Sequence, residues 1–479
     1  MKHNLIGGEW LPGSTSRQNI NPSDIADIVG EYAQADAEQA RAAIDVAAQA
    51  QQAWRDSGIQ TRATALDLVG SELLSRQVEL GTLLSREEGK TLAEGTAEVA
   101  RAGHIFKFFA AEALRTGGEK LPSVRPLVDV EVTREPVGVV GIITPWNFPM
   151  AIPAWKIAPA LAYGNSVVFK PADLVPGSAW ALAEVLHRSG IPPGVFNLVM
   201  GRGSIVGNEL GASSKVDAIS FTGSVDTGRR LLEQGARTFK KLQLEMGGKN
   251  PLVILDDADL DVAVDCAIQG AYFSTGQRCT ASSRFIVQKG IYSRFVSRMK
   301  ESLSQLRVGH ALEPQTQIGP VVDEDQLTQD LAYVEIGKSE GATLAYGGTT
   351  VSRSTRGYFL SPAFFTDASP AMRIAREEIF GPVACATPVD SYEEALEVAN
   401  DSEFGLSAGI CTTSLKHATH FKRNIRSGMV MVNVPTAGVD YHVPFGGTKA
   451  SSFGPREQGT HAVEFFTTVK TAYTKAIFE

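Results

Sequence analysis

The feature that most constrains the fold is a series of short apolar segments that alternate with helical patterns. Each segment is bounded by Gly or Pro, and the first four occupy residues 137–143, 166–169, 195–199 and 218–221. Strands that are buried on both faces of a parallel sheet have this composition, because helices cover both faces of such a sheet. A second series occupies residues 251–255, 284–287, 383–388 and 429–432. The sequence therefore predicts an α/β fold, with a Rossmann-type sheet followed by a second α/β unit after Gly248.

The remaining elements are helices before the first sheet and a ribbon outside it. Residues 36–54 are rich in Ala and Gln, with Asp36 and Gln39 spaced as in a capping box, which predicts a surface helix. Further helical patterns reach about residue 114. Residues 128–134 alternate apolar and polar side chains as a half-exposed antiparallel strand does, and residues 465–475 alternate again. We expect these two segments to pair, and such a ribbon is a candidate edge for pairing between chains.

The length of the chain indicates how many domains it has, and its charge indicates which classes of binding partner are excluded. A chain of 479 residues exceeds one ordinary hydrophobic core, so we expect two or three domains. Its 45 basic and 53 acidic side chains give a formal charge of −8, which offers no general attraction to nucleic acid or anionic membranes. The first ten residues lack the apolar core of a signal peptide, and no later window holds 18 uninterrupted apolar residues. We therefore expect a cytoplasmic protein that binds neither nucleic acid nor membrane.

The cysteines and histidines form no pattern typical of a metal site or a disulfide framework. The four cysteines, at positions 266, 279, 385 and 411, include no CxxC pair, and the eight histidines include no HxH or HExxH. His417 and His420 are expected to face solvent on a helix. A free cysteine in a reducing compartment is usually a small buried hydrophobe, so each cysteine is interpreted as inert unless its neighbours indicate otherwise. No metal is expected.

Two motifs at the ends of predicted strands suggest a dinucleotide site. The segment 221–228 links a strand to a helix, where Gly223 permits close approach of a ligand and free helical N–H groups favour a pyrophosphate. Its G-x-x-x-x-G spacing differs from the usual G-x-G-x-x-G, and alone it is equally typical of an ordinary turn. Lys170 and Asp173 follow another strand and could hold ribose hydroxyls, although a surface lysine and a helix cap would look the same. Together the two motifs favour a dinucleotide.

One cysteine has neighbours suited to a nucleophile. Cys279 follows Arg278 at a Gly-Gln turn, where a nearby cation and backbone donors would lower the thiol pKa and favour the nucleophilic thiolate. An inert cysteine is the alternative. Glu245 lies 34 residues earlier (279 − 245) in an apolar, Gly-rich loop, a setting that would raise its pKa and suit a general base.

Six segments occur in one order along the chain: TPWNFP at 144–149, FTGS at 221–224, LEMGGK at 244–249, GQRC at 276–279, EIFGP at 378–382 and PFGG at 444–447. In order and spacing they resemble the aldehyde dehydrogenase superfamily, and the resemblance runs essentially from end to end. It implies that Cys279 attacks the aldehyde carbonyl to form a thiohemiacetal, while the Asn147 amide and the Cys279 backbone N–H stabilise the oxyanion. Hydride transfer to the nicotinamide leaves a thioester, which water activated by Glu245 hydrolyses to the acid.

The resemblance also implies the residues that bind the cofactor, NAD or NADP. Glu378 would hold the nicotinamide ribose, and Phe380 would pack near the nicotinamide. Lys170 would bind the adenosine ribose, and Ser224 would contact the pyrophosphate. The further cofactor positions are Ile143, Thr144, Pro145, Trp146, Ala172, Asp173, Gly203, Phe221, Gly223 and Gly228, and Lys156 joins the catalytic set. Because Asp173 is one methylene shorter than the Glu frequent in the family, the preference between NAD and NADP stays open.

Arg278 is the main indication of the substrate. Its guanidinium could bind a distal carboxylate or phosphate by paired hydrogen bonds. The equal alternatives are a structural salt bridge and an effect on Cys279 alone. The other side chains expected around the substrate are Phe148, Trp155 and Phe445.

Residues 277–284, 154–156 and 451–452 resemble a subgroup of the family, the bacterial α-ketoglutaric semialdehyde (2,5-dioxopentanoate) dehydrogenases. This implies a small, carboxylated aldehyde as substrate. Succinic semialdehyde or another aliphatic aldehyde is the alternative, although many succinic semialdehyde dehydrogenases carry an arginine where Trp155 stands. The segment 449–459, KASSFGPREQG, departs from the usual Lys-x-Ser-Gly pattern and is expected to alter the mouth of the substrate tunnel.

The resemblance further implies three structural parts and a homodimer or homotetramer. The cofactor-binding domain would comprise residues 1–117 and 139–247, the catalytic domain residues 248–447, and a small β oligomerisation element residues 118–138 and 460–479. A catalytically silent cofactor-binding protein with this fold is the alternative from another class, and a CoA-acylating enzyme and a thiol esterase are two more. Intact Cys279, Glu245 and Asn147 argue against a silent protein. Acylating relatives generally lack the carboxylate at position 245.

Overall fold

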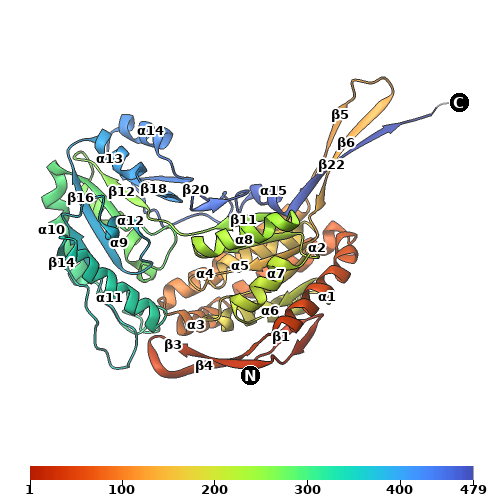
Figure 1. Ribbon diagram of the computed structural model, residues 1–479, viewed down its shortest axis with the longest axis horizontal. Coiled ribbons are helices and arrows are strands. Elements are labelled where there is room, and N and C mark those ends of the chain that lie inside the picture. Colours follow the sequence, from red (N-terminus) through yellow and green to blue (C-terminus); the bar gives the residue numbers. More distant parts are fainter. Residues whose placement is uncertain (478–479) are drawn as a thin grey trace.

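Each of the two predicted series of strands forms its own sheet in the computed structural model, which describes residues 1–477 (Figure 1). The first sheet has the strand order β2-β1-β9-β8-β7-β10-β11-β21, and its five central strands are parallel. These strands are β1 (Asn4–Ile6), β2 (Glu9–Leu11), β7 (Val139–Ile143), β8 (Ser166–Lys170), β9 (Phe196–Leu198), β10 (Ala218–Thr222), β11 (Lys241–Glu245) and β21 (Ser452–Phe453). The predicted Rossmann-type sheet is confirmed, whereas strands β1, β2, β11 and β21 are additions to the prediction.

The chain order of the first sheet reverses between β7 and β10. From β7 the chain runs outward through β8 to β9, and then crosses back to β10 and continues to β11. In doubly wound sheets, ligands bind at the carboxyl ends of the strands on either side of such a reversal. Residues 144–147 follow β7 and residues 223–224 follow β10, so two of the six family segments flank this crevice.

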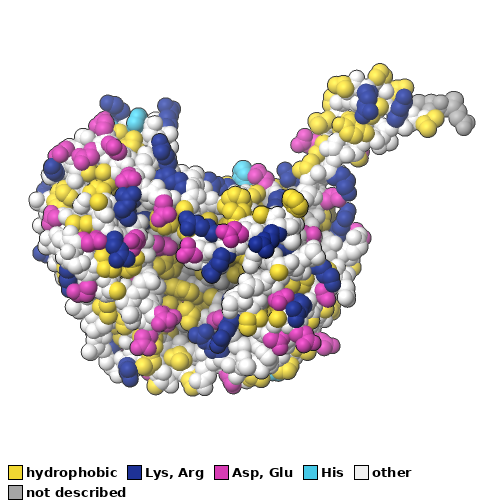
Figure 2. Space-filling model, in the orientation of Figure 1, with side chains coloured by type: hydrophobic (Ala, Val, Ile, Leu, Met, Phe, Trp, Pro, Cys, Tyr) yellow, Lys and Arg dark blue, Asp and Glu magenta, His cyan; other side chains and the backbone are white. Residues whose placement is uncertain are grey.

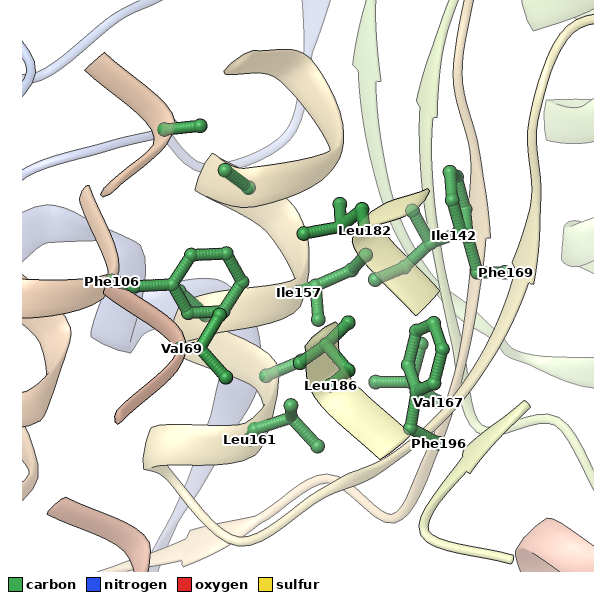
Figure 3. Packing of buried hydrophobic residues seen from close by; sticks show 14 of the residues in the cluster. Val69, Phe106, Ile142, Ile157, Leu161, Val167, Phe169, Leu182, Leu186 and Phe196 are labelled. Atoms are coloured by element: carbon green, nitrogen blue, oxygen red, sulfur yellow. The ribbon is translucent and has the colours of Figure 1, made fainter. Parts of the chain in front are cut away.

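Helices cover both faces of the first sheet. The largest hydrophobic core joins one face of the sheet to five helices: α2 (Ile59–Ser75), α3 (Gln77–Glu88), α4 (Leu92–Ala113), α5 (Ala151–Ala162) and α6 (Pro176–Arg188). Every residue of α5 is buried, and all of them except Lys156 are apolar, as expected for a helix in the core of a large domain. Figure 3 shows why: Ile157 of α5 lies between Phe106 of α4 and the strand residue Val167. On the other face pack α1 (Ala37–Arg55), α7 (Asn208–Ala212) and α8 (Val225–Thr238).

The second sheet forms the other lobe and has the order β14-β15-β16-β13-β12-β18-β19, with β14 antiparallel to the rest. Its strands are β12 (Pro251–Ile254), β13 (Arg284–Gln288), β14 (Thr343–Tyr346), β15 (Ala363–Thr366), β16 (Val383–Val389), β18 (Ser407–Cys411) and β19 (Met429–Val432). Its helices are α9 (Leu260–Ala271), α10 (Lys289–Gln305), α11 (Glu324–Ser339), α12 (Arg373–Arg376), α13 (Tyr392–Asn400) and α14 (Leu415–Asn424). The four strands predicted for this unit are confirmed, and β14, β15 and β18 were not predicted.

A three-stranded ribbon projects from the first lobe (Figure 1). It consists of β5 (Glu119–Pro122), β6 (Val128–Pro136) and β22 (Thr467–Lys475), with β6 in the centre. Strand β22 pairs antiparallel with β6 along its whole length, from Thr467 opposite Pro136 to Lys475 opposite Val128. The predicted pairing of the two alternating segments is confirmed. Two smaller pairs, β3 (Thr15–Asn21) with β4 (Asp24–Gln34) and β17 (Phe404–Gly405) with β20 (Thr448–Lys449), and the short helix α15 (Val463–Phe466) complete the fold.

Two local expectations need correction. Asp36 caps α1 by accepting from the Gln39 backbone N–H at 2.9 Å, but the Gln39 side chain donates to the Pro12 carbonyl instead of closing a capping box. His417 and His420 lie on a helix as expected, yet both contact Tyr392 rather than solvent alone. The His417 ring stacks on Tyr392 at 4.5 Å, and His420 Nδ1 lies 2.7 Å from the Tyr392 hydroxyl.

Within residues 1–477, no helix combines the length and the apolar character that a membrane crossing requires. The same residues contain no group of three or more His, Cys, Asp or Glu side chains placed to hold a metal ion. Cys266, Cys385 and Cys411 are buried free thiols, and Cys279 is partly exposed. The interpretation of three cysteines as buried hydrophobes is therefore confirmed, and Cys279 is the one that a ligand can reach.

Candidate active site

The crevice between the two lobes contains Asn147 and Cys279, which come from different lobes. Figure 2 shows the surface hollowed between the lobes. Both residues line a cavity of about 220 Å³. The Asn147 amide donates to the backbone carbonyl of Gln277 at 3.0 Å, two residues before Cys279. This contact places the predicted oxyanion group beside the predicted nucleophile.

The same cavity brings together six of the predicted cofactor residues: Pro145, Trp146, Gly223, Ser224, Glu378 and Phe380. Phe380 has a φ of 64°, a strained value for a side-chain-bearing residue, and its ring meets the Trp146 ring edge-on at 5.4 Å. Burial raises the pKa of Glu378 to about 7, and Glu378 accepts a hydrogen bond from the Gly248 N–H at 2.9 Å. A strained aromatic residue and a buried carboxyl at one cavity are features typical of a ligand site.

The other predicted cofactor residues do not line this cavity, but several adjoin one another farther along the sheet edge. Lys170 Nζ lies 3.6 Å from Asp173 Oδ1, and a Cβ placed on Gly203 would lie 3.9 Å from Lys170 Nζ. Ile143 and Phe221 are buried in their strands, and Thr144 donates its N–H to the Lys170 carbonyl at 3.2 Å. Ala172 precedes Asp173 and is partly exposed, and Gly228 packs in α8 against Met246.

A sharp turn presents Cys279 to the cavity. Three successive residues before it, Ser274, Thr275 and Gly276, have φ values of 50°, 56° and 69°. Only glycine adopts this left-handed region without cost, so the surroundings must hold the other two. Glu94 of α4 does so, because its Oε1 accepts from the Ser274 N–H at 2.7 Å and from the Ser274 hydroxyl at 3.0 Å.

Arg278 is part of the same support. Its guanidinium donates to Glu94 Oε1 at 3.2 Å and to the Ser274 hydroxyl at 2.8 Å. Of the alternatives left open by the sequence, the structural salt bridge is therefore present. Arg278 also touches the second cavity described below.

The expectation of a lowered thiol pKa at Cys279 is wrong, although the charge of Arg278 does act on this thiol. Burial, together with the carboxyls of Glu378 and Glu245, raises the pKa of Cys279 to about 12. The backbone N–H groups of Cys279 and Thr280 point toward the sulfur and oppose this shift without reversing it. The Arg278 guanidinium is paired with Glu94. In the free protein the nearby carboxyls therefore affect the Cys279 thiol more than the nearby positive charge does.

Glu245 ends β11 at the carboxyl edge of the first sheet, and its environment matches the expectation for a general base. Burial raises its pKa well above the usual value, and neighbouring Glu457 adds to the effect. The Ser452 hydroxyl donates to Glu245 Oε2 at 2.5 Å and opposes the shift. A Cβ on Gly446, where φ is 143°, would lie 2.7 Å from Glu245 Oε1, so the absence of a side chain at Gly446 makes room for the carboxyl.

Residues of the unusual segment 449–459 take two different places: Gln458 contacts Arg101 of the second cavity described below, whereas Ser452 lies at Glu245. Strand β21 pairs antiparallel with β11, which sets Ser452 directly opposite Glu245. Ser452 therefore contacts the carboxyl of the predicted general base, and it does not line the cavity on the substrate side of Cys279. The sequence pattern alone could not distinguish these places, because it does not reveal the antiparallel pairing.

Lys156 lies in a buried charged cluster behind Glu245. Its ammonium forms an ion pair with Glu457 and donates to the Ser220 hydroxyl at 2.9 Å. Both Lys156 and Glu457 are almost fully buried, a setting in which the loss of either partner leaves an uncompensated charge. Lys156 influences Glu245 through its charge.

A second buried ion pair fixes the Asn147 loop. Lys90 Nζ donates to Glu98 Oε2 at 2.7 Å and to the Asn147 carbonyl at 2.7 Å, and it lies 3.9 Å from the centre of the Phe148 ring. The other oxygen of Glu98 accepts from the N–H groups of Met150 and Ala151 at 2.9 and 3.1 Å, at the start of α5. Neither Lys90 nor Glu98 was identified from the sequence.

A second cavity, of about 120 Å³, adjoins Cys279. It is lined by all four predicted substrate residues, Phe148, Trp155, Arg278 and Phe445, together with Arg101, Ala151, Ile152, Thr280, Ala437, Gly438 and Val439. The rings of Trp155 and Phe445 lie 5.4 Å apart. Cys279 belongs to the lining of both cavities, so one sulfur adjoins the cavity at the sheet edge and the smaller one beyond it.

Arg101 is the residue in this cavity that the sequence analysis missed. It lies on α4, one turn after Glu98 and two turns after Glu94. The spacing i, i+4, i+7 places these three charged residues on one face of the helix. Charges that share a face with the buried Ile105 would have been a usable signal, because such charges are rarely buried without a role.

Comparisons with known proteins show the family of the chain. A family model described as "Aldehyde dehydrogenase family" matches residues 10–472. The chain is 42% identical over 476 residues to an "Alpha-ketoglutaric semialdehyde dehydrogenase" of Bacillus subtilis, covering 98% of each chain. It is 36% identical over 468 residues to a "Succinate-semialdehyde dehydrogenase [NADP(+)]" of Escherichia coli, covering 97% of this chain and 96% of the relative.

The fold is also that of solved structures. A betaine aldehyde dehydrogenase from Staphylococcus aureus in complex with NAD+ matches with a TM-score of 0.97 and 33% sequence identity, covering 99% of this chain and 95% of that chain. The predicted fold and the predicted family are thereby confirmed. The chain belongs to the aldehyde dehydrogenase family, and its activity is the NAD(P)-dependent oxidation of an aldehyde.

Proposed function

We propose that the protein oxidises α-ketoglutaric semialdehyde to 2-oxoglutarate, with NAD or NADP as the hydride acceptor. The observation that carries the proposal is the position of Cys279 between two cavities, one with the predicted cofactor residues and one with the predicted substrate residues. The sequence similarity to an α-ketoglutaric semialdehyde dehydrogenase supports the choice of aldehyde.

The cofactor fits the first cavity on two observations. The Thr222 hydroxyl lines this cavity and is buried without a hydrogen-bond partner among the described residues. The first N–H groups of α8 begin directly after Ser224, at the positive end of the helix dipole, which favours a phosphate. Bound NAD(P)+ would supply the hydride acceptor and a positive charge.

The residues of this chain would then act in sequence. The Cys279 thiol gives up its proton to solvent water as Sγ forms a bond to the aldehyde carbon, and the Asn147 amide stabilises the oxyanion that the carbonyl oxygen becomes. Loss of hydride from that carbon leaves a thioester. Glu245 takes a proton from water, whose oxygen attacks the thioester and releases the acid and the Cys279 thiol.

Rates with a panel of aldehydes test the proposal. The panel contains α-ketoglutaric, succinic and glutaric semialdehydes, betaine aldehyde and pentanal, each with NAD and with NADP. We expect the highest kcat/KM for α-ketoglutaric semialdehyde. A higher value for another aldehyde would reject it as the substrate, and the two cofactors compared at one substrate reveal the preference between NAD and NADP.

We further infer a division into domains that follows the predicted boundaries, a cytoplasmic location, and a homodimer or homotetramer. Free thiols at all four cysteines support a reducing compartment. The projecting ribbon supports self-association, because Leu121, Val469 and Tyr473 are exposed on it.

A further inference from the structure

We propose that Arg101 binds the distal carboxylate of the substrate and thereby selects acidic aldehydes over neutral and cationic ones. The inference rests on the proposed function, because it requires a substrate that carries a carboxylate. It assigns to Arg101 the recognition that the sequence alone suggested for Arg278.

The guanidinium of Arg101 is the cation in the second cavity that is available to a ligand. Its hydrogen-bond acceptor among the described residues is the amide oxygen of Gln458, which is neutral, at 3.3 Å. The Arg278 guanidinium, by contrast, is paired with Glu94 at 3.2 Å. A free carboxylate can therefore form an ion pair with Arg101 without displacing a carboxylate of the protein.

Three N–H donors of residues that line the cavity lack acceptors. The Nε atoms of Arg101 and Arg278 and the Nε1 atom of Trp155 are buried, and none has a hydrogen-bond partner among the described residues. The Arg101 guanidinium lies 5.7 Å from the centre of the Trp155 ring, whereas the Arg278 guanidinium is already paired with Glu94. Buried donors are almost always satisfied in proteins, so unsatisfied donors at one cavity indicate a ligand rich in acceptor oxygens.

The nearby acidic residues do not neutralise Arg101. Glu98 acts on Arg101 through its charge, but its oxygens are engaged by Lys90 and by the N–H groups at the start of α5. Asp440 also acts on Arg101 through its charge, but Asp440 is exposed, so solvent screens its effect. Burial lowers the pKa of Arg101, yet a guanidinium stays protonated at neutral pH. The cavity therefore holds a partly desolvated positive charge within electrostatic range of Cys279.

The geometry fits an aldehyde with a charged distal end. A substrate whose carbonyl carbon reaches Cys279 would extend past Trp155 and Phe445, whose rings cover its apolar middle. Its distal carboxylate would then lie at Arg101. A trimethylammonium group at that end would be repelled by the same guanidinium, and an uncharged end would gain nothing from it.

The test compares wild type, Arg101→Met and Arg101→Lys on three aldehydes with different distal charge. These are α-ketoglutaric semialdehyde, pentanal and betaine aldehyde. For Arg101→Met we expect kcat/KM on the semialdehyde to fall by about tenfold or more, mainly through KM, because a charge-assisted pair is lost from uniform binding. The value for pentanal should stay within about threefold, and the value for betaine aldehyde should stay constant or rise. Arg101→Lys keeps the charge without the fork of donors and should fall between the two.

Lys107→Met is the matched control. Lys107 lies on the same helix, and its ammonium pairs with Asp67 at 2.7 Å on the outer surface. Its replacement removes one positive charge from α4 outside the cavity, and it should leave the ratios among the three aldehydes unchanged.

Each result supports or overturns the proposal. An equal loss on all three aldehydes in Arg101→Met would show a structural role, and an unchanged value for the semialdehyde would show no role. If wild type itself prefers pentanal or betaine aldehyde, the proposed substrate fails, and the assignment of Arg101 fails with it. If Arg101→Met does not fold, a second measurement tests the proposal: inhibition of pentanal oxidation by glutarate, which should compete for the second cavity. Arg101→Lys should weaken this inhibition severalfold relative to wild type. Absence of inhibition in wild type would overturn the proposal.

Discussion

At the scale of single residues, the free protein holds both the proposed nucleophile, Cys279, and the proposed general base, Glu245, against ionisation. Burial is the largest cause at Cys279 and at Glu245, and in both cases a neighbouring carboxyl adds to the rise in pKa. Carboxyls with raised pKa values are suited to accept a proton near neutral pH. The two groups are therefore tuned by the same physical effect, although one must attack carbon and the other must activate water.

Replacing Glu245 by Gln should separate the two halves of the reaction. Attack by Cys279 and hydride loss precede the step that needs the base, so one equivalent of reduced cofactor per active site should form rapidly. The following steady rate should be lower than in wild type by a factor of about 10² to 10⁴, the usual contribution of a general base. Stopped-flow absorbance at 340 nm measures both phases. Absence of the initial burst would contradict this division of roles.

Replacing Ser452 by Ala should shift the pH dependence of turnover. The Ser452 hydroxyl donates to Glu245 Oε2 at 2.5 Å, and this bond lowers a pKa that burial has raised. Its loss raises the pKa of Glu245 further, so less carboxylate is present at a given pH. The acidic limb of the kcat profile should therefore move toward higher pH.

The neighbouring residue provides the control for this measurement. The Ser451 hydroxyl accepts from the Gly405 N–H at 3.0 Å and does not contact Glu245, so Ser451→Ala should leave the acidic limb in place. A shift of the limb toward lower pH in Ser452→Ala would show that the hydroxyl disfavours the carboxylate.

At the scale of elements, the strands and the turns that follow them could be predicted from the sequence, because both depend on short-range patterns. Apolar runs predict strands β7 and β10, and their strand ends and the family resemblance indicate the segments that follow them, whereas the reversal of strand order between them was not predicted. The contributions of α4 could not be predicted in this way. Glu94 contacts Ser274 across 180 residues, and Lys90 contacts Asn147 across 57 residues. Nothing local indicates which buried charge will meet which loop.

The pair of Lys90 and Glu98 should hold the Asn147 loop in its working position. Lys90→Met leaves Glu98 buried without its counter-charge, so we expect the free energy of unfolding to fall by about 3 kcal/mol. We expect kcat to fall as well, because the Asn147 carbonyl loses its donor. Urea denaturation and steady-state kinetics measure the two effects.

The double variant Lys90→Met with Glu98→Gln separates stability from positioning. It removes the unpaired charge but keeps an acceptor for the N–H groups of α5, so stability should recover by about 1 to 2 kcal/mol. The kcat should stay low, because the donor to Asn147 is still missing. Recovery of kcat together with stability would show that the pair has no positioning role.

At the scale of the whole molecule, the ribbon of β5, β6 and β22 leaves the body of the protein and carries apolar side chains into solvent (Figure 1). On β22, Val469 and Tyr473 are both 60% exposed. Strand β22 is an outer strand of the ribbon, and an open edge with apolar residues is a template for pairing with another chain.

Charges on β22 should therefore reduce self-association. Replacing Val469 and Tyr473 by Lys should shift the protein toward monomers, measured by size-exclusion chromatography with light scattering. Replacing the exposed Thr468 and Lys470 by Ala is the matched change at other positions of the same strand, and it should leave the mass unchanged. A monomeric wild type would contradict the inferred oligomer.

The contact of Cys279 with two separate cavities has a consequence for how such an enzyme can diversify. The residues that line the cavity proposed for the cofactor differ from those that line the cavity proposed for the aldehyde, except for Cys279, which borders both. Substitutions at positions such as 101, 155 and 445 can alter which aldehyde is accepted while the redox half of the centre stays intact. One fold can therefore come to oxidise new aldehydes while its cofactor site is unchanged. For the same reason, Arg101 is a suitable first position for redesign of the substrate preference.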